Sequence, residues 1–509
     1  MITRSMICCW EAGLILSKRM EISNKIQQAS KWSLVTEIVS KLTSPITNMV
    51  LARLLVPEAF GMVATVTMIT SLADLLANAG FQKYLVQCDH EGEEYDRRTN
   101  VAFWANLSVS ALLWIVIALF RNPIAAAAGN GGLGTALAVA SLSLPLTALS
   151  STQMARFRRD LDFKTLFYAK LLGICIPLIV TIPLAFVLRS FWALILGNLA
   201  VSVSNAVLLT LRSKWKPSFY FCFSRLCEML GFSLWTFLEQ FLGWANLNIG
   251  IFVVGVFLSD YYLGLYKTSM ASVNQIMSIL VNAVSPVLLS SLSRLKDDDR
   301  EYKAVFYQFE ETISMVIFPL GIGIFVFRDL YTQILLGSQW GEAASFVGLW
   351  SLVRAVWVVF GMFSMEVLVS KGKPRLSALT QALVLAALLP VLFITAKTGY
   401  ETLYIARSLV VIWSIVIEMA TMYAAVRISP LEILRRAAPY LLAAICMGVV
   451  GELLLGISRG IVWQFTSVLI CMVVYFALIC LYPRSRKNFV GTLRTALKKS
   501  EQGEADVDQ

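Results

Sequence analysis

The sequence predicts an all-α integral membrane protein with about 14 transmembrane helices: two parallel six-helix lobes followed by two further helices. Three observations support this fold class. The 509-residue chain is 58% hydrophobic and only 15% charged, whereas an average soluble protein is about 25% charged. Its long apolar runs are typical of membrane-spanning helices. Its basic residues recur in alternate loops, and one hairpin motif occurs in both halves of the chain.

Fourteen apolar runs are each about 20 residues long, which is enough for a helix to cross the hydrocarbon core of a bilayer. Only Arg189 lies between the fifth run and the sixth, which begins at Ser190, so a tight hairpin is expected there. The stretch 219–232 is expected to form an interfacial helix before the seventh span. The runs are 32–56, 59–82, 99–120, 133–152, 165–188, 190–211, 233–258, 262–290, 309–328, 346–369, 377–396, 402–426, 438–457 and 461–482.

The distribution of the 43 lysines and arginines predicts the orientation of the chain. With the N-terminus inside, 32 of them fall in the inner segments, six in the outer loops and five within spans. This is the bias that the positive-inside rule describes. Both termini are therefore predicted to be cytoplasmic. The net charge of +11 follows from the same bias, so no nucleic-acid partner is expected.

The sequence disfavours an enzyme and an ATP-driven pump. The single histidine, His90, lies in an acidic loop and cannot by itself build a two- or three-histidine metal site. The nine cysteines lack zinc-binding spacing and are expected to be free thiols. No phosphate-binding P-loop is present. No cofactor or metal is expected, and the function is predicted to lie within the membrane because the loops are short.

The predicted domain organisation has six parts. Because Glu21 to Lys31 resembles an ordinary amphipathic lead into the first span, Met20 is a hypothetical translation start. An intact mass that includes residues 1–19 would contradict this hypothesis. The parts are a cytoplasmic segment 1–31, an N-terminal lobe 32–211, a cytoplasmic linker with an interfacial helix 212–232, a C-terminal lobe 233–426, two further spans 427–482 and a cytoplasmic tail 483–509.

An internal repeat supports the two-lobe arrangement. The segment 55–63 closes the first span and opens the second, and the segment 258–266 does the same for the seventh and eighth spans. Their glycines, Gly61 and Gly264, are 203 positions apart. Because each repeat starts on the inner side, the repeats are expected to be parallel, related by an axis along the membrane normal. Such an architecture is typical of a transporter with its substrate path between the lobes.

Polar residues recur at helical spacing inside four predicted spans, so each set shares one helix face. Polar and charged groups are costly in hydrocarbon, which makes these sets candidates for a water-filled substrate cavity. Snorkelling of Lys170 and Arg407, and an internal ion pair between Glu37 and Lys41, are the structural alternatives. The four sets are Glu37, Lys41, Ser44 and Asn48; Thr67, Ser71, Asp74 and Asn78; Lys267, Asn274, Ser278 and Ser285; and Arg407, Ser414 and Glu418.

Five motifs, in order, resemble the polysaccharide transporter family of the multidrug/oligosaccharidyl-lipid/polysaccharide exporter superfamily, nearest the colanic-acid and teichuronic-acid type. The resemblance covers residues from about 30 to 375. The sequence departs from many relatives at Asn246-Leu247-Asn248, where they carry an acid. The motifs are Leu51 to Gly61, Asn78 to Phe81, Arg156 to Lys164, Leu263 to Tyr266 and Leu336 to Trp340.

The resemblance implies a flippase that moves a polyprenyl-pyrophosphate-linked oligosaccharide from the inner to the outer leaflet by alternating access. Its partners would be this lipid-linked substrate, membrane lipid and, in the cell, a polysaccharide polymerase and a chain-length regulator. The predicted headgroup cavity contains the cations Lys41, Arg53, Lys267 and Arg354 and the amides Asn48, Asn78 and Asn274. Candidates for coupling to a proton or Na⁺ gradient are Glu37, Asp74, Glu239 and Glu418.

Two rival functions remain open at this point. A multidrug efflux antiporter of the same superfamily would expel organic cations and should have a net acidic cavity. The charges within spans are nearly balanced and do not decide between these readings. A membrane-embedded glycosyl or phosphoglycosyl transferase would need an acidic catalytic loop at the membrane edge, and the acidic inner loop 89–96 is small. The tryptophans Trp235, Trp244, Trp350 and Trp357 are candidates either for stacking on sugars or for core packing.

Overall fold

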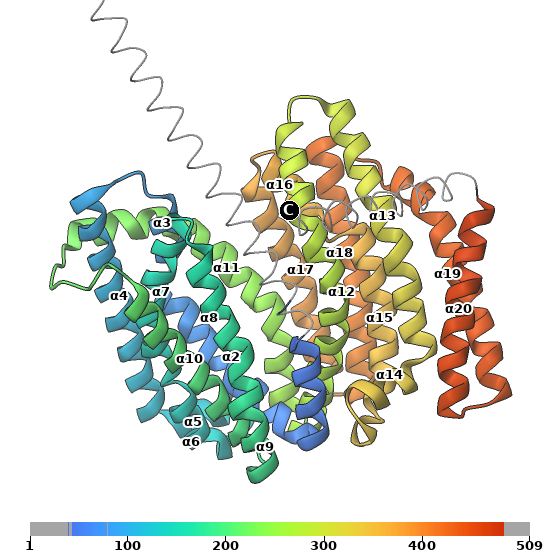
Figure 1. Cartoon of the computed structure of the whole chain (residues 1–509), viewed down its shortest axis with the longest axis horizontal. Helices are drawn as coiled ribbons and strands as arrows, with labels where there is room; N and C mark the ends of the chain where they lie inside the picture. Colours follow the sequence, from blue (N-terminus) through green and yellow to red (C-terminus); the bar gives the residue numbers. More distant parts are fainter. Residues whose placement is uncertain (1–38, 40–42, 79, 483–509) are drawn as a thin grey trace, which may run out of the picture. The chain divides into compact units, whose positions relative to one another are not determined.

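A computed structural model describes residue 39 and the ranges 43–78 and 80–482. Within these residues every regular element is a helix and no strand occurs. The chain divides into two compact units, Met1–Trp244 and Ala245–Gln509, whose helices can be followed along the chain in Figure 1. The predicted all-α membrane fold class is confirmed.

The N-terminal unit consists of antiparallel helices that follow one another through short connections. Residues 43–54 are helical and precede α2. The unit ends within α11, a single 35-residue helix that includes much of the stretch predicted to be interfacial. The elements are α2 Pro57–Asn78, α3 Phe81–Gln87, α4 Gly92–Leu119, α5 Arg121–Ala127, η1 Gly131–Leu133, α6 Gly134–Ala140, α7 Ser143–Arg159, α8 Phe163–Ile176, η2 Pro177–Thr181, α9 Ile182–Leu188, α10 Trp192–Arg212 and α11 Phe223–Phe257.

The C-terminal unit contains the remaining helices. Its last two long helices correspond to the two spans predicted to follow the second lobe, and α19 packs against both α13 and α20. A hydrogen bond of 2.7 Å from the Tyr475 hydroxyl to the Met315 carbonyl ties α20 to α13. The elements are α12 Asp260–Arg294, α13 Asp299–Val326, α14 Arg328–Leu335, η3 Ser338–Trp340, α15 Ala343–Phe360, α16 Ser364–Ser370, α17 Pro374–Thr395, α18 Tyr400–Val426, α19 Pro430–Ile457 and α20 Ile461–Leu481.

Twelve helical segments in the described part of the chain are long and apolar enough to cross a membrane. They correspond to twelve of the predicted spans. The other two predicted spans, 32–56 and 262–290, are not among the twelve. Residues 32–38 and 40–42 lie outside the described residues, and 262–290 falls within α12. The total of 14 spans therefore stays a prediction.

The repeated hairpin motif begins a helix in each half of the chain. In the first copy, Pro57 is the first residue of α2 and Glu58 lies in its first turn. In the second copy, Asp260 opens α12 after Ser259. Proline fits the first helical turn because its missing N–H is not needed there. A carboxylate in the first turn is stabilised by the positive end of the helix dipole, so both copies specify a helix start.

Two local features follow from backbone chemistry. The predicted tight hairpin is present, because α9 ends at Leu188 and α10 begins at Trp192. Between these helices Arg189 adopts a left-handed conformation with φ of 46°. In the preceding span, Pro177 opens a short π-helical turn, η2, between α8 and α9. Proline cannot donate to the helical ladder, and a π turn is one way for a membrane helix to accommodate that loss.

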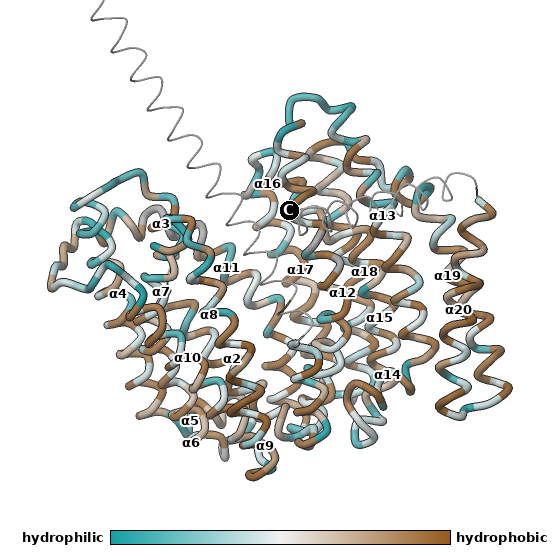
Figure 2. The backbone as a smooth tube through the Cα atoms, viewed as in Figure 1, coloured by the Kyte–Doolittle hydropathy of each residue, from teal (hydrophilic) through white to brown (hydrophobic). Residues whose placement is uncertain are grey.

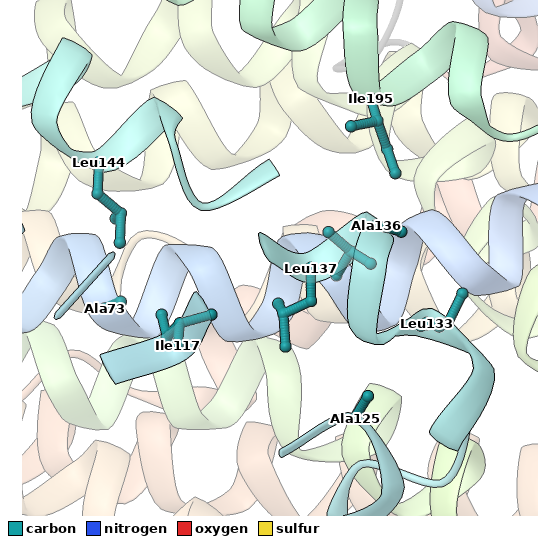
Figure 3. Packing of buried hydrophobic residues seen from close by; sticks show 9 residues of the cluster. Ala73, Ile117, Ala125, Leu133, Ala136, Leu137, Leu144 and Ile195 are labelled. Atoms are coloured by element: carbon teal, nitrogen blue, oxygen red, sulfur yellow. The ribbon is translucent and has the colours of Figure 1, made fainter. Parts of the chain in front are cut away.

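The core of the N-terminal unit is built from small and branched apolar side chains that converge from several helices. Figure 3 shows one cluster, to which α2, α4, α6, α7 and α10 contribute and in which Ala73 of α2 lies near Ile117 of α4 and Leu144 of α7. A second cluster around Tyr84, Tyr95 and Met229 joins α3, α4 and α11. The cluster in Figure 3 consists of Val66, Ala73, Ile117, Ala125, Leu133, Ala136, Leu137, Leu144 and Ile195. These contacts fix α2, which carries the polar face described below.

The helices of the C-terminal unit approach each other closely where glycines face a neighbour. A Cβ placed on Gly321 of α13 would lie 2.4 Å from the Cβ of Ala355 and 3.0 Å from the Ser351 carbonyl of α15. A Cβ on Gly448 of α19 would lie 2.7 Å from Ile322 of α13. Small residues at such positions let membrane helices gain van der Waals contact without a hydrophobic driving force.

Apolar side chains also cover much of the outer surface of the helices. Leu119, Val187 and Val462 are 74%, 77% and 80% exposed. Figure 2 shows that the long helices are predominantly hydrophobic, whereas hydrophilic residues gather at helix ends and connections. Lipid tails solvate such apolar surfaces, as expected for spanning helices.

We predict that Gly321→Val destabilises the protein, because the added side chain would overlap α15. Overpacking of this kind costs about 1–3 kcal/mol. Gly323→Val is the matched control, since nothing lies within 4 Å of a Cβ built at Gly323 on the same helix. The measurement is the thermal midpoint of the detergent-solubilised protein. Equal midpoints for the two variants would contradict the close packing of α13 on α15.

Candidate functional site

A polar pocket of about 520 Å³ opens within the N-terminal unit. The ends of α2 and α7, the short helix α3 and the middle of α11 surround it. It brings together Ser71, Asp74 and Asn78, which the sequence analysis placed on one polar face of a span, and the candidate Trp244, with residues from α3 and α7. Its lining is Ser71, Asp74, Leu75, Asn78, Gly80, Gln82, Lys83, Val86, Gln87, Arg158, Gln240 and Trp244. On the predicted topology these are the inner ends of the helices.

Asn78 is held at the pocket by a network of side-chain hydrogen bonds. Its amide donates to the backbone carbonyl of Asp74 at 3.1 Å. The buried amide of Asn106 on α4 donates to the Asn78 oxygen at 3.2 Å and to the Ser151 hydroxyl of α7 at 2.7 Å. Polar groups buried in a membrane protein need such partners, so this network joins three helices and orients the pocket floor.

The opposite wall of the pocket comes from α11. The Trp244 indole N–H donates to the Ser71 hydroxyl on α2 at 2.9 Å. Trp244 also belongs to a stacked row with Phe241 and Phe237 on the same helix. Glu239, predicted to be a coupling carboxylate, lies 3.9 Å from the ammonium group of Lys83 on α3. The structure therefore places Glu239 beside a pocket cation that sequence reasoning did not select.

A dense charge network closes the same end of the N-terminal unit. Arg98 of α4 is 6% exposed; it donates to the Tyr84 hydroxyl and, at 2.9 Å, to Glu228. Its guanidinium also contacts Glu94 at 3.2 Å, and Glu94 pairs with Arg225 at 2.8 Å. The hydrogen bond from Arg98 holds the pKa of the Glu228 carboxyl below its usual range. This network fixes the start of α11 against α3 and α4.

A second group of predicted residues meets within the C-terminal unit. Arg354 on α15 stacks over the Trp357 ring at 4.0 Å. The Trp357 indole nitrogen and the Glu418 carboxylate of α18 both lie beside Gly361, and Glu418 and Arg354 attract each other. A Cβ on Gly361 would lie 2.0 Å from a carboxylate oxygen of Glu418, so glycine is required where this side chain meets the end of α15. We call Arg354, Trp357 and Glu418 the C-unit triad.

Asn274 and Arg407 lie around a neighbouring tryptophan. The Trp350 indole donates to the Asn274 oxygen at 3.2 Å, which joins α15 to α12. Arg407 of α18 lies 5.1 Å from the centre of the Trp350 ring, and its charge acts on the Tyr266 hydroxyl. Trp350 is only 3% exposed, so the structure favours core packing over sugar stacking for this residue.

The other predicted site residues are less clustered or lie outside the described part of the chain. Lys267 is half-buried on α12, two turns before Asn274. Arg53 and Asn48 are exposed on the helix formed by residues 43–54. Glu37 and Lys41 lie outside the described residues, and the side chain of Trp235 is likewise not described.

A second pocket, of about 440 Å³, lies within the C-terminal unit between α13, α14, α19 and α20. Its lining is almost entirely apolar and includes Met315, Met447, Met472 and Phe476. Methionine is flexible enough to adapt to an irregular apolar ligand. The sequence analysis did not identify this pocket, because its residues read as ordinary membrane-facing positions.

Buried carboxylates were also missed. Glu310 of α13 is 1% exposed, and neither of its carboxylate oxygens has a hydrogen-bond partner among the described residues. Glu366 accepts a hydrogen bond of 2.6 Å from Ser285. Among the described residues, no group of three or more histidine, cysteine, aspartate or glutamate side chains is arranged to hold a metal ion.

Comparison with known proteins identifies the family and several relatives of this chain. The family described as Polysaccharide biosynthesis protein matches residues 50–345. The succinoglycan biosynthesis transport protein ExoT of Rhizobium meliloti (strain 1021) is 21% identical over 325 residues, which cover 64% of this chain and 65% of ExoT. The lipopolysaccharide biosynthesis protein WzxC of Escherichia coli (strain K12) is 20% identical over 330 residues, covering 64% and 65%. The chain thus spans 65% of the length of each relative.

Two solved structures share the fold at low identity. The inward closed conformation of the lipid II flippase MurJ has a TM-score of 0.72 and 14% identity, covering 89% of this chain and 98% of MurJ. An inward-facing multidrug resistance MATE family transporter has a TM-score of 0.59 and 14% identity, covering 76% and 94%.

The twelve long apolar helices of the described part of the chain define a multi-pass membrane protein, whose fold is shared with the MurJ structure. Within that class, the chain belongs to the polysaccharide biosynthesis protein family, as its sequence motifs indicate.

We predict that the polar pocket is open to water. In a cysteine-free background, Ser71→Cys should react with a membrane-impermeant maleimide at least tenfold faster than Ala73→Cys. Ser71 lines the pocket, whereas Ala73 lies two residues away in the buried core at 5% exposure. The measurement is the labelling rate in inside-out vesicles. Equal rates at the two positions would show that the face of α2 that carries Ser71 is not the one open to water.

Proposed function

We propose that this protein moves a polyprenyl-pyrophosphate-linked oligosaccharide from the inner to the outer leaflet of the bacterial cytoplasmic membrane. The family match over residues 50–345 is the observation that carries the proposal. The names of ExoT and WzxC, which refer to succinoglycan and lipopolysaccharide biosynthesis, support a polysaccharide precursor as the cargo. The fold shared with the lipid II flippase MurJ supports a cargo that is linked to a lipid.

The two units offer groups suited to the two ends of such a substrate. A pyrophosphate and its sugars need cations and hydrogen-bonding side chains, because their transfer into hydrocarbon is prohibitively costly. The polar pocket and the C-unit triad supply both kinds of group. The apolar pocket between α13, α14, α19 and α20 has the chemistry to accept part of a polyprenyl chain.

Arg354 is our candidate for headgroup binding in the C-terminal unit. Its guanidinium lies over the Trp357 ring at 4.0 Å, and its Nε atom has no hydrogen-bond partner among the described residues. An aromatic face stabilises a cation without neutralising it. The guanidinium fork therefore remains able to bind phosphate oxygens, for which its planar geometry is well suited.

Glu418 is our candidate for proton coupling. Carboxylates inside membrane transporters commonly act as proton relays. When Glu418 is ionised it attracts Arg354, and protonation removes that attraction. Proton binding would thereby release the guanidinium for an anionic headgroup. A lone carboxylate suits a proton better than Na⁺, which is coordinated by several oxygen atoms at once.

We expect Arg354→Gln to slow transfer of a short polyprenyl-pyrophosphate oligosaccharide about tenfold or more, since a charge-assisted hydrogen bond contributes about 1.5–3 kcal/mol. The measurement is protein-dependent exposure of the glycan to an external lectin in proteoliposomes. The control is Arg459→Gln, which removes an exposed cation from a predicted outer loop.

Three outcomes of this assay are informative. Wild-type transfer that persists in Arg354→Gln would remove Arg354 from the headgroup site. Absence of wild-type transfer across the short polyprenyl-pyrophosphate glycans tested would contradict the proposed function. Uptake of organic cations by the same vesicles would then favour the multidrug efflux alternative.

We also expect transfer by the wild-type protein to respond to an imposed pH gradient, and Glu418→Gln to abolish that response. Glutamine keeps the size of the side chain but cannot exchange a proton. The measurement is the transfer rate with and without the gradient at fixed membrane potential. Glu432→Gln is the control, since Glu432 forms an i,i+4 pair with Arg436 outside the triad. A gradient response retained by Glu418→Gln would assign coupling elsewhere.

A further inference from the structure

The polar pocket of the N-terminal unit carries two cations at its rim, and neither was selected from the sequence. Lys83 comes from α3 and Arg158 from the end of α7. Asp74, Asn78 and Ser71 line the part of the pocket formed by α2. Its lining therefore combines two cations from α3 and α7 with hydroxyl, amide and carboxylate groups from α2, within a volume of about 520 Å³. This is an ordinary volume for a small-molecule site.

Arg158 differs from the two other arginines at the end of α7. Arg156 pairs with Asp96 at 2.5 Å. Arg159 donates to the His90 carbonyl at 2.6 Å and lies 3.8 Å from the centre of the Tyr95 ring. Arg158 is exposed, and its hydrogen bond among the described residues is to the Met154 sulfur at 3.4 Å. Its neighbours are thus occupied in holding the fold, while its own charge has no acidic partner within 4 Å in the described structure.

Lys83 is held only loosely by its acidic neighbour. Its ammonium group is 3.9 Å from Glu239, and the Lys83 side chain is 54% exposed. Exposed ion pairs of this length stabilise little. A doubly charged phosphate ligand can therefore compete with Glu239 for Lys83 at small cost.

The chemistry of the rim points to phosphate rather than to a simple carboxylate or a cation. A guanidinium and an ammonium together can bind several oxygens of a pyrophosphate, the first through its planar fork and the second as a point charge. The Asp74 carboxylate would repel phosphate from the part of the pocket that α2 lines. This carboxylate, with the Asn78 amide and the Ser71 hydroxyl, suits sugar hydroxyls instead. The distribution of charge thus sets the orientation of an amphiphilic phospho-sugar.

We propose that Lys83 and Arg158 form a receiving site for the phosphate groups of the lipid-linked oligosaccharide, with its first sugar directed toward Asp74 and Asn78. The proposal rests on the proposed function for the identity of the cargo. It places the initial recognition of the headgroup within the N-terminal unit, at the predicted inner ends of α2, α3 and α7. The C-unit triad is a different set of residues and belongs to the C-terminal unit.

The test measures binding of radiolabelled undecaprenyl pyrophosphate to the full-length protein in nanodiscs of neutral lipid. We expect Lys83→Gln and Arg158→Gln each to weaken binding several-fold, and the double variant to weaken it at least tenfold. Arg158→Lys should recover only part of the loss, because it restores the charge without the fork. The matched control is Lys164→Gln with Lys214→Gln, two exposed lysines of the same unit that lie outside the pocket.

Two results would overturn the site. One is wild-type affinity in the double variant with an unchanged thermal midpoint. The other is an equal loss in the Lys164→Gln, Lys214→Gln control, which would indicate general surface charge. A competition experiment identifies which phosphate-bearing molecule the site binds. Displacement of the probe by phosphatidylglycerol at similar concentration would assign the site to membrane lipid and overturn the substrate assignment.

The same variants separate this site from the proposed function. If wild-type protein moves the glycan and the double variant binds and moves it equally well, the receiving site fails and the function stands. If wild-type protein moves no glycan yet binds the probe through Lys83 and Arg158, the site stands and the function fails.

Discussion

The rest of the structure depends on one constraint: a polar group within the hydrocarbon must find its partner inside the protein or in a water-filled pocket. Asn106 illustrates the first solution, since its buried amide bridges Asn78 and Ser151 and ties α2 to α4 and α7. Asp74 illustrates the second, since it lies on α2, like Asn78, and lines an open polar pocket. The two solutions are adjacent, so the network that stabilises the N-terminal unit also shapes its candidate site.

Aromatic rings provide a third solution that keeps a charge available. Arg354 lies over Trp357 and Arg407 over Trp350, each within 5.1 Å of the ring centre. Glu418 attracts Arg354 without forming a salt bridge to it within 4 Å in the described structure, and the aromatic face compensates part of the desolvation cost while leaving the charge in place. Two tryptophans that read as sugar-stacking candidates from the sequence thus serve the cations beside them. This explains how positively charged side chains persist in an apolar helix bundle and still attract an anion.

Sequence reasoning located the helices well because hydrophobic run length and the positive-inside bias report directly on membrane spans. Helical spacing also identified the face of α2 that carries Ser71, Asp74 and Asn78, since period alone determines which residues share a face. It could not determine which helices meet that face. Trp244 and Ser71 are 173 positions apart in the chain, and their hydrogen bond depends on tertiary packing. Glu310 was missed for a similar reason, because burial of a residue near a span end is decided by its neighbours.

Lys83 and Arg158 were counted only as topological charges, and this shows a limit of the positive-inside argument. The same residues that orient a chain in the membrane lie at the inner ends of its helices, where an anionic headgroup would first meet the protein. A loop arginine that binds phosphate is therefore indistinguishable from one that only sets topology until its partners are known. Arg156 and Arg159 have structural partners, and Arg158 does not have an acidic one among the described residues. The informative observation is thus a cation that lines a pocket and has no acidic partner among the described residues. Only the folded structure reveals it.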